Sequence, residues 1–414
     1  MRFAFASIGS LGDLHPMLAM AVAAMHRGHD VVVAAAPGYA ANVARAGLEF
    51  HPLRPAIPED AESLAYYFDM KRGPRRLLQD MIFADVAATH EDLCGAVRGA
   101  DLLVVGELLY TAPIVAADEK IPWLNVVLAP TSMLSATDPC VLAPAPWLHK
   151  FRHLGPWLHR LAYRFGRIEG RMWASGYYRF RRSLGLPAGA NPIFDAKHSP
   201  FGTLAMFPDF LAAPQPDWPA NTVQAGFPFY HQGGNLEVAR DFLRRGSPPV
   251  VFTLGSIVAH FEPSFYEAAA EATQILGHRA ILLTGRNAAV PQNLPDSILA
   301  VNYAPLHSVL PHACAIVHAG GIGTCAEALK AGLPSVVIPY AFDQPDNASR
   351  LRRLGVAEIL PRNSISARNL AAKLERLLKT PDASSAASRL ANMIHPQDAL
   401  NRALDKMESL ARTP

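Results

Sequence analysis

A glycine-rich turn within residues 315–348 has the residue types needed to bind a phosphate group. Gly320, Gly321 and Gly323 let backbone N–H groups approach a ligand closely, because glycine has no side chain in the way. A helix is predicted to begin directly after them, and the positive end of its dipole favours an anion. His318 precedes the glycines at the end of an apolar strand, where an imidazole N–H could reach a phosphate oxygen. The turn therefore predicts a phosphate site.

The same turn matches a dinucleotide-binding pattern. Residues 321–326 read G-x-G-x-x-A, and Asp343 follows Gly323 by 20 residues, beyond the next strand. In that pattern the acid accepts a ribose hydroxyl. Glycines near a helix start also serve packing alone, so a dinucleotide, another nucleotide and a structural role all stay open. A Walker-type phosphate loop is excluded, because the sequence has no G-x-x-x-x-G-K-[ST].

Two further features favour a nucleoside diphosphate that carries a sugar. A second glycine turn, FTLGS, ends another strand and supplies Ser256. Asp343 and Gln344 are adjacent in DQPDN, and a carboxylate beside a carboxamide can bind several neighbouring hydroxyls, as on a sugar ring. Cys325 would be reactive only if it were exposed at the helix start, and we interpret it as a small buried side chain.

Apolar strands that alternate with helices predict two αβα domains in tandem. The expected divisions are residues 1–227 for the first domain, 228–247 for a proline- and glycine-rich linker, 248–395 for the second domain, which holds the glycine turn, and 396–414 for a C-terminal helix that packs back toward the first domain. Ligands of open parallel sheets bind outside the carboxyl ends of the strands. Two such domains facing each other across a cleft could hold one ligand each.

The composition is that of an ordinary globular protein. Of the 414 residues, 50% are hydrophobic and 18% are charged, and the net charge of +3 does not argue for a nucleic-acid partner. The four cysteines form no C-x-x-C pair, so neither zinc nor a disulfide framework is indicated, which fits a reducing cytoplasm. The N-terminal residues read as a first strand rather than a signal peptide. No apolar run reaches the roughly 20 residues of a membrane-spanning helix.

The stretch HAGGIGT…E…AGLP…P…DQPDNA resembles the donor-binding signature of the inverting nucleotide-sugar glycosyltransferases of family 1, which have the GT-B fold. SIGSLGDLHPMLAMA is similar to the N-terminal loop and first helix of this family, so the resemblance covers essentially the whole chain. The stretch from HSPFGTLAMF to VQAGFPF most resembles the rhamnosyltransferase subunit of rhamnolipid synthesis. The resemblance implies a metal-independent hexosyltransferase (EC 2.4.1 type) without a cofactor, with the nucleotide sugar as co-substrate.

The resemblance also implies a set of donor-binding residues. They are Ser256, Tyr303, Pro305, Leu306, His318, Gly320, Gly321, Ile322, Gly323, Thr324, Glu327, Asp343 and Gln344. Relatives bind the diphosphate with the histidine, the glycine-loop backbone and the serine, the ribose hydroxyls with the glutamate, and the sugar with the last two residues. Tyr303 stands where relatives stack an aromatic ring on the pyrimidine. Leu306 departs from the plant enzymes, which have glutamine there, so uridine and thymidine stay open.

The general base is expected from the N-terminal domain. Asp13 lies in the turn after the first strand, and relatives have histidine or aspartate at this position. A carboxylate in a partly apolar site has a raised pKa and serves better as a base. Alternatively, Asp13 only caps a helix that starts near His15. His15 could itself be the base or a helix-start residue, and Glu107, just after another strand, could orient or assist the base.

Residues 147–182 are rich in arginine and aromatic side chains. Three interpretations stay open: an amphipathic face lying on anionic lipid, an acceptor lid whose arginines meet a carboxylate, and a solvated helix face with its apolar positions in the core. The first would make the protein a peripheral partner of the membrane's inner face. Nucleic acid is not expected, since no recognised binding fold accompanies these charges.

These observations predict a cytoplasmic glycosyltransferase. It would move a hexose, rhamnose from dTDP-rhamnose or next glucose from UDP-glucose, to a hydroxyl of a hydrophobic lipid or natural-product acceptor, with inversion and with Asp13 as base. The alternatives are a dinucleotide-dependent oxidoreductase, a non-catalytic module that binds a nucleotide sugar or lipid, and an epimerase or hydrolase on the same fold. Acceptor identity and oligomeric state are beyond the reach of the sequence, because acceptor pockets are built from variable loops.

Overall fold

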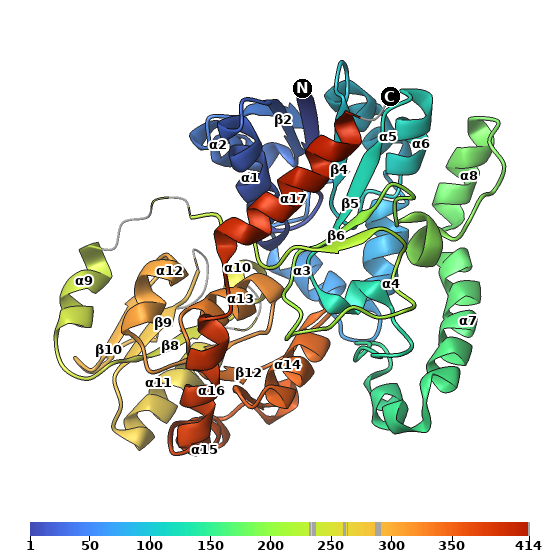
Figure 1. Ribbon diagram of the computed structural model, residues 1–414. Helices are drawn as coiled ribbons and strands as arrows, with labels where there is room; N and C mark the ends of the chain where they lie inside the picture. The colour runs from blue at the N-terminus through green and yellow to red at the C-terminus, as the bar shows by residue number, and fades with distance from the viewer. Residues whose placement is uncertain (232, 234–236, 260–261, 263, 286–290, 413–414) are drawn as a thin grey trace.

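The computed structural model describes residues 1–231, 233, 237–259, 262, 264–285 and 291–412. These residues form two α/β units, each built on one parallel sheet (Figure 1). The predicted fold class of two αβα domains is therefore confirmed.

The N-terminal unit contains a seven-stranded sheet in the order β3-β2-β1-β4-β5-β6-β7. Its strands are β1 (Arg2–Ala6), β2 (Asp30–Ala35), β3 (Glu49–Pro52), β4 (Leu102–Val105), β5 (Trp123–Val127), β6 (Thr203–Ala205) and β7 (Thr222–Gln224). Strand β1 lies between β2 and β4, and its Phe3 stands opposite Val31 of β2 and Leu102 of β4. Apart from Arg2 and Asp30 at their first positions, β1, β2 and β4 are apolar and buried, because both faces of the sheet are covered.

Helices cover both faces of this sheet. The helices of this unit are α1 (Leu11–His26), α2 (Ala40–Arg45), α3 (Ala61–Tyr67), α4 (Gly73–Arg76), α5 (Val86–Ala96), α6 (Ala112–Asp118), α7 (Pro156–Trp173) and α8 (Ser175–Ser183). Shorter turns include the 3₁₀ helices η1 (Pro37–Tyr39), η3 (Pro130–Met133) and η4 (Pro146–Leu154) and the π-helical turns η2 (Leu77–Ile82) and η5 (Pro192–Ala196). Helices α7 and α8 stand at the periphery of the molecule (Figure 1).

The C-terminal unit contains a six-stranded sheet in the order β10-β9-β8-β11-β12-β13. Its strands are β8 (Val250–Thr253), β9 (Ala280–Leu283), β10 (Ile298–Val301), β11 (Ala315–His318), β12 (Ser335–Val337) and β13 (Ala357–Ile359). Its helices are α9 (Glu237–Arg244), α10 (Gly255–Val258), α11 (Ser264–Leu276), α12 (Leu306–Val309), α13 (Ile322–Lys330), α14 (Gln344–Arg353), α15 (Ala367–Leu378) and α16 (Pro381–Ala391), with 3₁₀ turns η6 (Leu310–His312) and η7 (Arg362–Ser364).

The two units share apolar contacts. One buried cluster joins Val127 and Phe207 of the first unit to Leu329 and Leu351 of the second. The last helix, α17 (Pro396–Ala411), crosses back over the N-terminal unit, where Leu404 packs in the core beside α1 (Figure 1).

Several elements lie where the sequence showed no regular pattern. Strands β6 and β7 lie in or beside the proline- and glycine-dense region before residue 228, and α9 occupies residues 237–244 of the expected linker. Strands of three residues are too short to show a period of two, and they form because an existing sheet edge supplies their hydrogen-bond partners.

Candidate active site

The first helix begins earlier than expected, and this changes the local role of Asp13. Helix α1 starts at Leu11 rather than near His15, with Ser10 as its N-cap. Asp13 therefore lies inside the first turn, not in the loop before it and not at the cap position. Its Oδ2 atom accepts hydrogen bonds from Ser10 N at 2.7 Å and from Ser10 Oγ at 3.0 Å, which completes a capping box. Both bonds fall on Oδ2, so neither engages Oδ1.

The loop before α1 is shaped around this carboxylate. Gly9 has a left-handed φ of +143°, and a Cβ atom there would overlap the carboxylate of Asp13. Tyr39 donates a hydrogen bond of 3.2 Å from its hydroxyl to the Gly9 carbonyl oxygen. The position therefore needs glycine, both for its backbone angle and for the close approach of Asp13.

The charge of Asp13 is disfavoured at this place. Burial raises the pKa of Asp13 to about 6, hydrogen bonds from Ser10 oppose the shift, and the charge of Glu107 adds to it. Glu107 follows β4 and accepts hydrogen bonds from Leu128 N at 3.1 Å and from the hydroxyl of Ser132. These bonds occupy both carboxylate oxygens of Glu107. The structure thus brings Glu107 near Asp13 as a fixed neighbouring charge that raises the pKa of a base.

His15 lies two residues further along α1, about half a turn on, and faces the other unit. Its ring centroid is 5.7 Å from that of Tyr230. Burial lowers the pKa of His15, while the charge of Glu327 on α13 opposes that shift. His15 is therefore half-buried between the two units, next to an expected donor-binding residue.

On the C-terminal side, His318 ends β11 and is buried, with 1% of its surface exposed. Its Nδ1 atom accepts a 3.0 Å hydrogen bond from Gly320 N. Burial lowers the pKa of His318 to about 4, so the ring is neutral near pH 7 and carries its proton on Nε2. Nε2 is buried and has no hydrogen-bond partner among the described residues. An unpaired buried donor of this kind is suited to a ligand oxygen.

The glycine turn leads directly into α13. Gly320 has a φ of +93°, and its Cβ position would lie 2.7 Å from Val337 Cγ1. Gly321 is the N-cap of α13. A Cβ atom added at Gly321 or at Gly323 would meet nothing within 4 Å, so there is open space beside the start of this helix. Ile322 and Thr324 complete its first turn, whose backbone N–H groups have no partner within a helix.

Cys325, which follows Thr324 in α13, is fully buried. Burial raises the pKa of its thiol well above the usual value. Its Sγ atom lies 3.4 Å from the carbonyl oxygen of Gly320. This agrees with the interpretation of Cys325 as a small buried side chain.

Asp343 and Gln344 have different environments although they are adjacent. Gln344 Oε1 accepts hydrogen bonds from Tyr340 N at 2.8 Å and Ala341 N at 3.1 Å. The amide oxygen therefore holds the backbone before α14, which leaves only the NH₂ group for a sugar hydroxyl. Asp343 accepts a 2.7 Å hydrogen bond from Asn347 Nδ2. Burial raises the pKa of Asp343 to about 7, and the charge of Asp13 contributes to that rise.

Asn347 connects this acid to the glycine turn. It is fully buried, and its Nδ2 atom also donates a 2.9 Å hydrogen bond to the carbonyl oxygen of Gly320. One amide group therefore fixes the distance between Asp343 and the glycine loop. The sequence analysis assigned no role to Asn347, although its i,i+4 spacing from Asp343 was a usable signal.

The expected nucleoside-binding residues lie along one edge of the C-terminal sheet. Tyr303, before α12, is 65% exposed and its ring is accessible for stacking. Pro305 is buried at the N-cap of α12, and Leu306 opens that helix. Ser256 lies in α10, but its side chain is outside the described residues.

Glu327 has a partner that the sequence did not suggest. His231 Nε2 lies 3.2 Å from Glu327 Oε1, and the His231 ring stacks on His307 with centroids 4.0 Å apart. Among the described residues, no group of three or more His, Cys, Asp or Glu is arranged to hold a metal ion.

Comparison with known proteins identifies the family. Residues 3–90 match the glycosyltransferase family 28 N-terminal domain, and residues 271–404 match the erythromycin biosynthesis protein CIII-like C-terminal domain. The chain is 30% identical over its whole length to O-mycaminosyltylonolide 6-deoxyallosyltransferase of Streptomyces fradiae, of which 98% is covered. The chain belongs to the family 1 GT-B glycosyltransferases.

Other relatives agree with this assignment. A sterol 3-beta-glucosyltransferase of Arabidopsis thaliana is 25% identical over 98% of the chain and 67% of its own length. A solved glycotransferase of kitacinnamycin is 25% identical with a TM-score of 0.72, over 99% of both chains. The spinosyn rhamnosyltransferase SpnG, solved with thymidine diphosphate, is similar in fold (TM-score 0.66, 20% identity, covering 98% of this chain and all of its own). The membership contradicts the oxidoreductase alternative.

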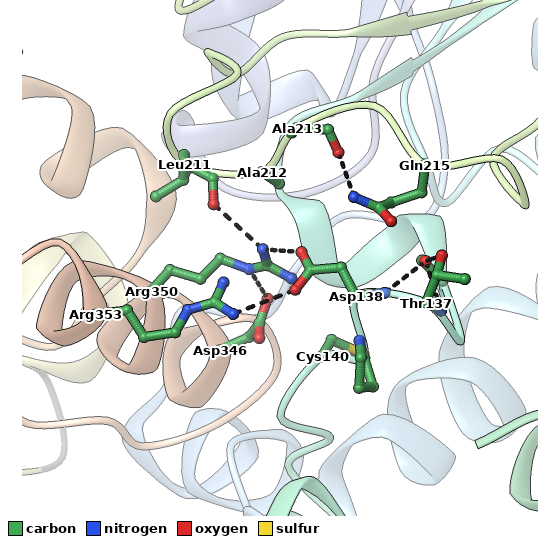
Figure 2. A network of polar contacts seen from close by, with 12 residues as sticks. Thr137, Asp138, Cys140, Leu211, Ala212, Ala213, Gln215, Asp346, Arg350 and Arg353 are labelled. Atoms are coloured by element: carbon green, nitrogen blue, oxygen red, sulfur yellow. Dashed lines mark hydrogen bonds and ion pairs between the residues drawn. The ribbon is translucent and has the colours of Figure 1, made fainter. Parts of the chain in front are cut away.

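In this glycosyltransferase an ion-pair network joins the two units near α14 (Figure 2). Arg350 of α14 is buried and pairs with Asp138 of the N-terminal unit at 2.5 Å and with Asp346 at 2.7 Å. Its guanidinium also donates to the Leu211 carbonyl oxygen at 3.2 Å. Arg353 adds a more exposed contact with Asp138 at 3.2 Å.

The same network reaches the backbone of the N-terminal unit, because Val141 N donates a 2.9 Å hydrogen bond to Asp346 Oδ1. Helix α14 carries Asp343 at its N-cap and Arg350 two turns later. The network therefore ties the helix that carries Asp343, an expected sugar-binding residue, to the domain of the expected base. The sequence offered no signal for this pairing, since Asp138 and Arg350 are 212 residues apart.

Proposed function

We propose that this glycosyltransferase transfers one hexose from a nucleoside-diphosphate sugar to a hydroxyl of a hydrophobic acceptor, with inversion and without a metal or cofactor. The first donor to test is dTDP-rhamnose and the second is UDP-glucose. The observation that carries the proposal is that Asp13 lies within electrostatic range of Asp343. Asn347 in turn connects Asp343 to the glycine loop, because its amide group donates hydrogen bonds to both. Solved relatives named as complexes with thymidine diphosphate support a thymidine nucleotide.

The donor would lie on the C-terminal unit. The diphosphate would accept hydrogen bonds from the first-turn N–H groups of α13 and from His318 Nε2, the buried donor without a partner among the described residues. Tyr303 would stack on the base, the Glu327 carboxylate would accept the ribose hydroxyls, and Asp343 would accept a sugar hydroxyl. These fixed donors would stabilise the charge that develops on the leaving diphosphate.

The transfer would be a single displacement. Asp13 Oδ1 takes the proton of the acceptor hydroxyl while the acceptor oxygen forms a bond to the anomeric carbon. The bond from that carbon to the diphosphate oxygen breaks on the opposite side, so the configuration inverts. Burial keeps the pKa of Asp13 near 6, so at pH 7 the carboxylate is ionised and can accept a proton. A general base is most effective when its pKa lies close to the working pH, as it does here.

The location is part of the same proposal. A cytoplasmic enzyme is supported by the four cysteines, which are free thiols. A peripheral contact with the membrane through residues 147–182 would place a membrane-dissolved acceptor beside the N-terminal unit. Within the described residues, no helix is both long enough and apolar enough to cross a membrane.

Thermal unfolding with added nucleotides tests the donor site. We expect dTDP or UDP to stabilise the wild type, by about 2.7 kcal/mol at a hundred times the dissociation constant, and His318→Ala to lose this effect. GDP and NAD serve as comparison ligands. Stabilisation by NAD alone would contradict the proposal.

Turnover then separates transfer from related reactions. Donor consumption must rise when an acceptor alcohol is added, and the product must have the inverted anomeric configuration. A donor consumption rate that is the same without acceptor would point to a hydrolase or epimerase, and binding without turnover to a non-catalytic module.

A further inference from the structure

The buried side of helix α7, which packs against the rest of the protein, has fewer large apolar side chains than its exposed side. Its buried residues are His159, Tyr163 and Gly170. At Gly166 and Gly170 a Cβ atom would lie 3.1 Å from the ring of Phe194, so the helix backbone is in close contact with η5. Glycine, histidine and tyrosine thus face inward, where an ordinary surface helix would place Leu, Ile or Phe.

The large apolar side chains of α7 point the other way. Trp157, Leu161, Phe165, Ile168 and Met172 are 44–64% exposed. With about 100° of rotation per residue they fall within a stripe roughly 80° wide, whose centre is opposite the buried side. Helix α7 is therefore amphipathic, but its apolar side faces outward, whereas a helix packed on a core turns its apolar side inward.

The preceding 3₁₀ helix, η4, carries three more exposed large apolar side chains. We define the α7 face as the exposed apolar side chains of both helices: Trp147, Phe151, Leu154, Trp157, Leu161, Phe165, Ile168 and Met172. They are eight of the fifteen large apolar side chains that are exposed in the described part of the chain. Such a concentration on one face marks an interaction surface rather than scattered surface residues.

Cations border the α7 face on one side. Residues 147–182 contain nine lysines and arginines and one acid, Glu169, in a chain whose net charge is only +3. The rest of the chain is therefore net negative. Arg160 and Arg164 are exposed along the edge of the apolar stripe, whereas Arg167 is paired with Asp195.

We propose that the α7 face docks on a bilayer surface that contains anionic phospholipids. Tryptophan, phenylalanine and leucine would enter the boundary between headgroups and acyl chains, and the bordering arginines would lie at the phosphates. A second copy of the chain fits less well, because a symmetric contact would bring two cationic borders together. The peripheral position of α7 leaves the face accessible (Figure 1).

Vesicle co-sedimentation of the full chain tests this without donor or acceptor, so its outcome is independent of the transfer reaction. We expect binding to vesicles of equimolar phosphatidylcholine and phosphatidylglycerol, weaker binding to phosphatidylcholine alone, and a loss of binding as salt rises. The double variant Trp157→Glu/Phe165→Glu should bind at least tenfold more weakly, or about 1.4 kcal/mol. Arg160→Gln/Arg164→Gln should reduce the preference for the anionic vesicles.

The matched control is Ile275→Glu/Met393→Glu, which adds the same charges at two exposed apolar positions elsewhere, 62% and 52% exposed. It should bind like the wild type, and all variants should keep the wild-type unfolding temperature. Absence of vesicle binding by the wild type, or equal binding by both glutamate doubles, would overturn the proposal. A wild-type dimer that Trp157→Glu/Phe165→Glu converts to a monomer, without vesicle binding, would show that a second copy covers the face.

Discussion

Asp343 of the C-terminal unit lies within electrostatic range of Asp13 of the N-terminal unit: burial raises the pKa of Asp343, and the charge of Asp13 raises it further. Asp13 stands on the first turn of α1 and Asp343 at the N-cap of α14. Each carboxyl group is also shifted by burial, to pKa values of about 6 and about 7. The interface between the units therefore holds two acids that resist ionising together, one on the expected acceptor side and one on the donor side.

Replacing Asp13 by asparagine should remove the base and keep the helix start. Asparagine can still accept the hydrogen bonds from Ser10 through its amide oxygen. We expect kcat to fall by about 10²–10⁴ with donor binding unchanged, measured by initial rates and by nucleotide titration. Ser10→Ala is the control: it should cost about 1 kcal/mol of stability through the lost cap and retain most of the activity. Near-normal turnover of Asp13→Asn would exclude this residue as the base.

The pH dependence of the rate should report the same group. Asp13 must be ionised to accept a proton, and burial raises its pKa to about 6. We therefore expect kcat/KM to fall on the acid side with a midpoint close to pH 6. The residual activity of Asp13→Asn should lose this acid limb. An acid limb that is identical in the variant would assign the titration to another group.

Asp343 should make stability depend on pH. In the native state Asp343 keeps its proton up to about pH 7, whereas in the unfolded chain it releases the proton near pH 3.8. The contribution of Asp343 to stability is therefore full below pH 3.8 and is lost as pH rises through 7. Asp343→Asn removes the cost of the charge and keeps an acceptor for Asn347. Its stability relative to the wild type should increase between pH 5 and pH 8 by on the order of 1–3 kcal/mol, followed by thermal unfolding.

A matched control for that experiment is Asp382→Asn, on the exposed first turn of α16. Its stability relative to the wild type should stay constant over the same pH interval. If Asp343→Asn behaves in the same way, Asp343 is ionised without cost in the native protein.

Asn347→Asp should disturb the donor site without touching the base. The new carboxylate would face the Asp343 carboxylate and the Gly320 carbonyl oxygen, where the amide now donates two hydrogen bonds. We expect a loss of about 1–3 kcal/mol in stability and a higher KM for the donor. Asn392→Asp, at the exposed end of α16, should change neither quantity. An unaltered donor KM in Asn347→Asp would show that Asn347 does not position Asp343.

The two arginines that pair with Asp138 across the units should differ strongly in their contribution to the free energy of unfolding. Arg350→Met leaves the buried Asp346 and the half-buried Asp138 without their main partner, so we expect a loss of about 3–5 kcal/mol by denaturant unfolding. Arg353 is 38% exposed, and Arg353→Met should cost about 0–1 kcal/mol. Equal losses for the two variants would mean that the buried network contributes no more than a surface pair.

The secondary structure around the expected donor site was predictable from the sequence, because its determinants are local. The strand, the glycine turn and the helix after it lie within a short stretch, and their spacing fixes where His318 and the glycines stand relative to the helix start. The two-sheet architecture was predictable for a similar reason, since wholly apolar strands separated by helices have few other arrangements. Helix boundaries were predicted less accurately. Because Ser10 and Asp13 form a capping box, α1 begins at Leu11 rather than near His15.

Only the tertiary structure decided which partner each polar side chain takes. Gln344 stands beside Asp343 in sequence, yet its amide oxygen binds backbone while the Asp343 carboxylate accepts a hydrogen bond from Asn347. Arg350 reaches an acid 212 positions away, and α7 turns its apolar side outward because glycines let it pack closely on Phe194. A sequence pattern records periodicity and local spacing, but partner choice depends on which distant elements the fold places next to each group.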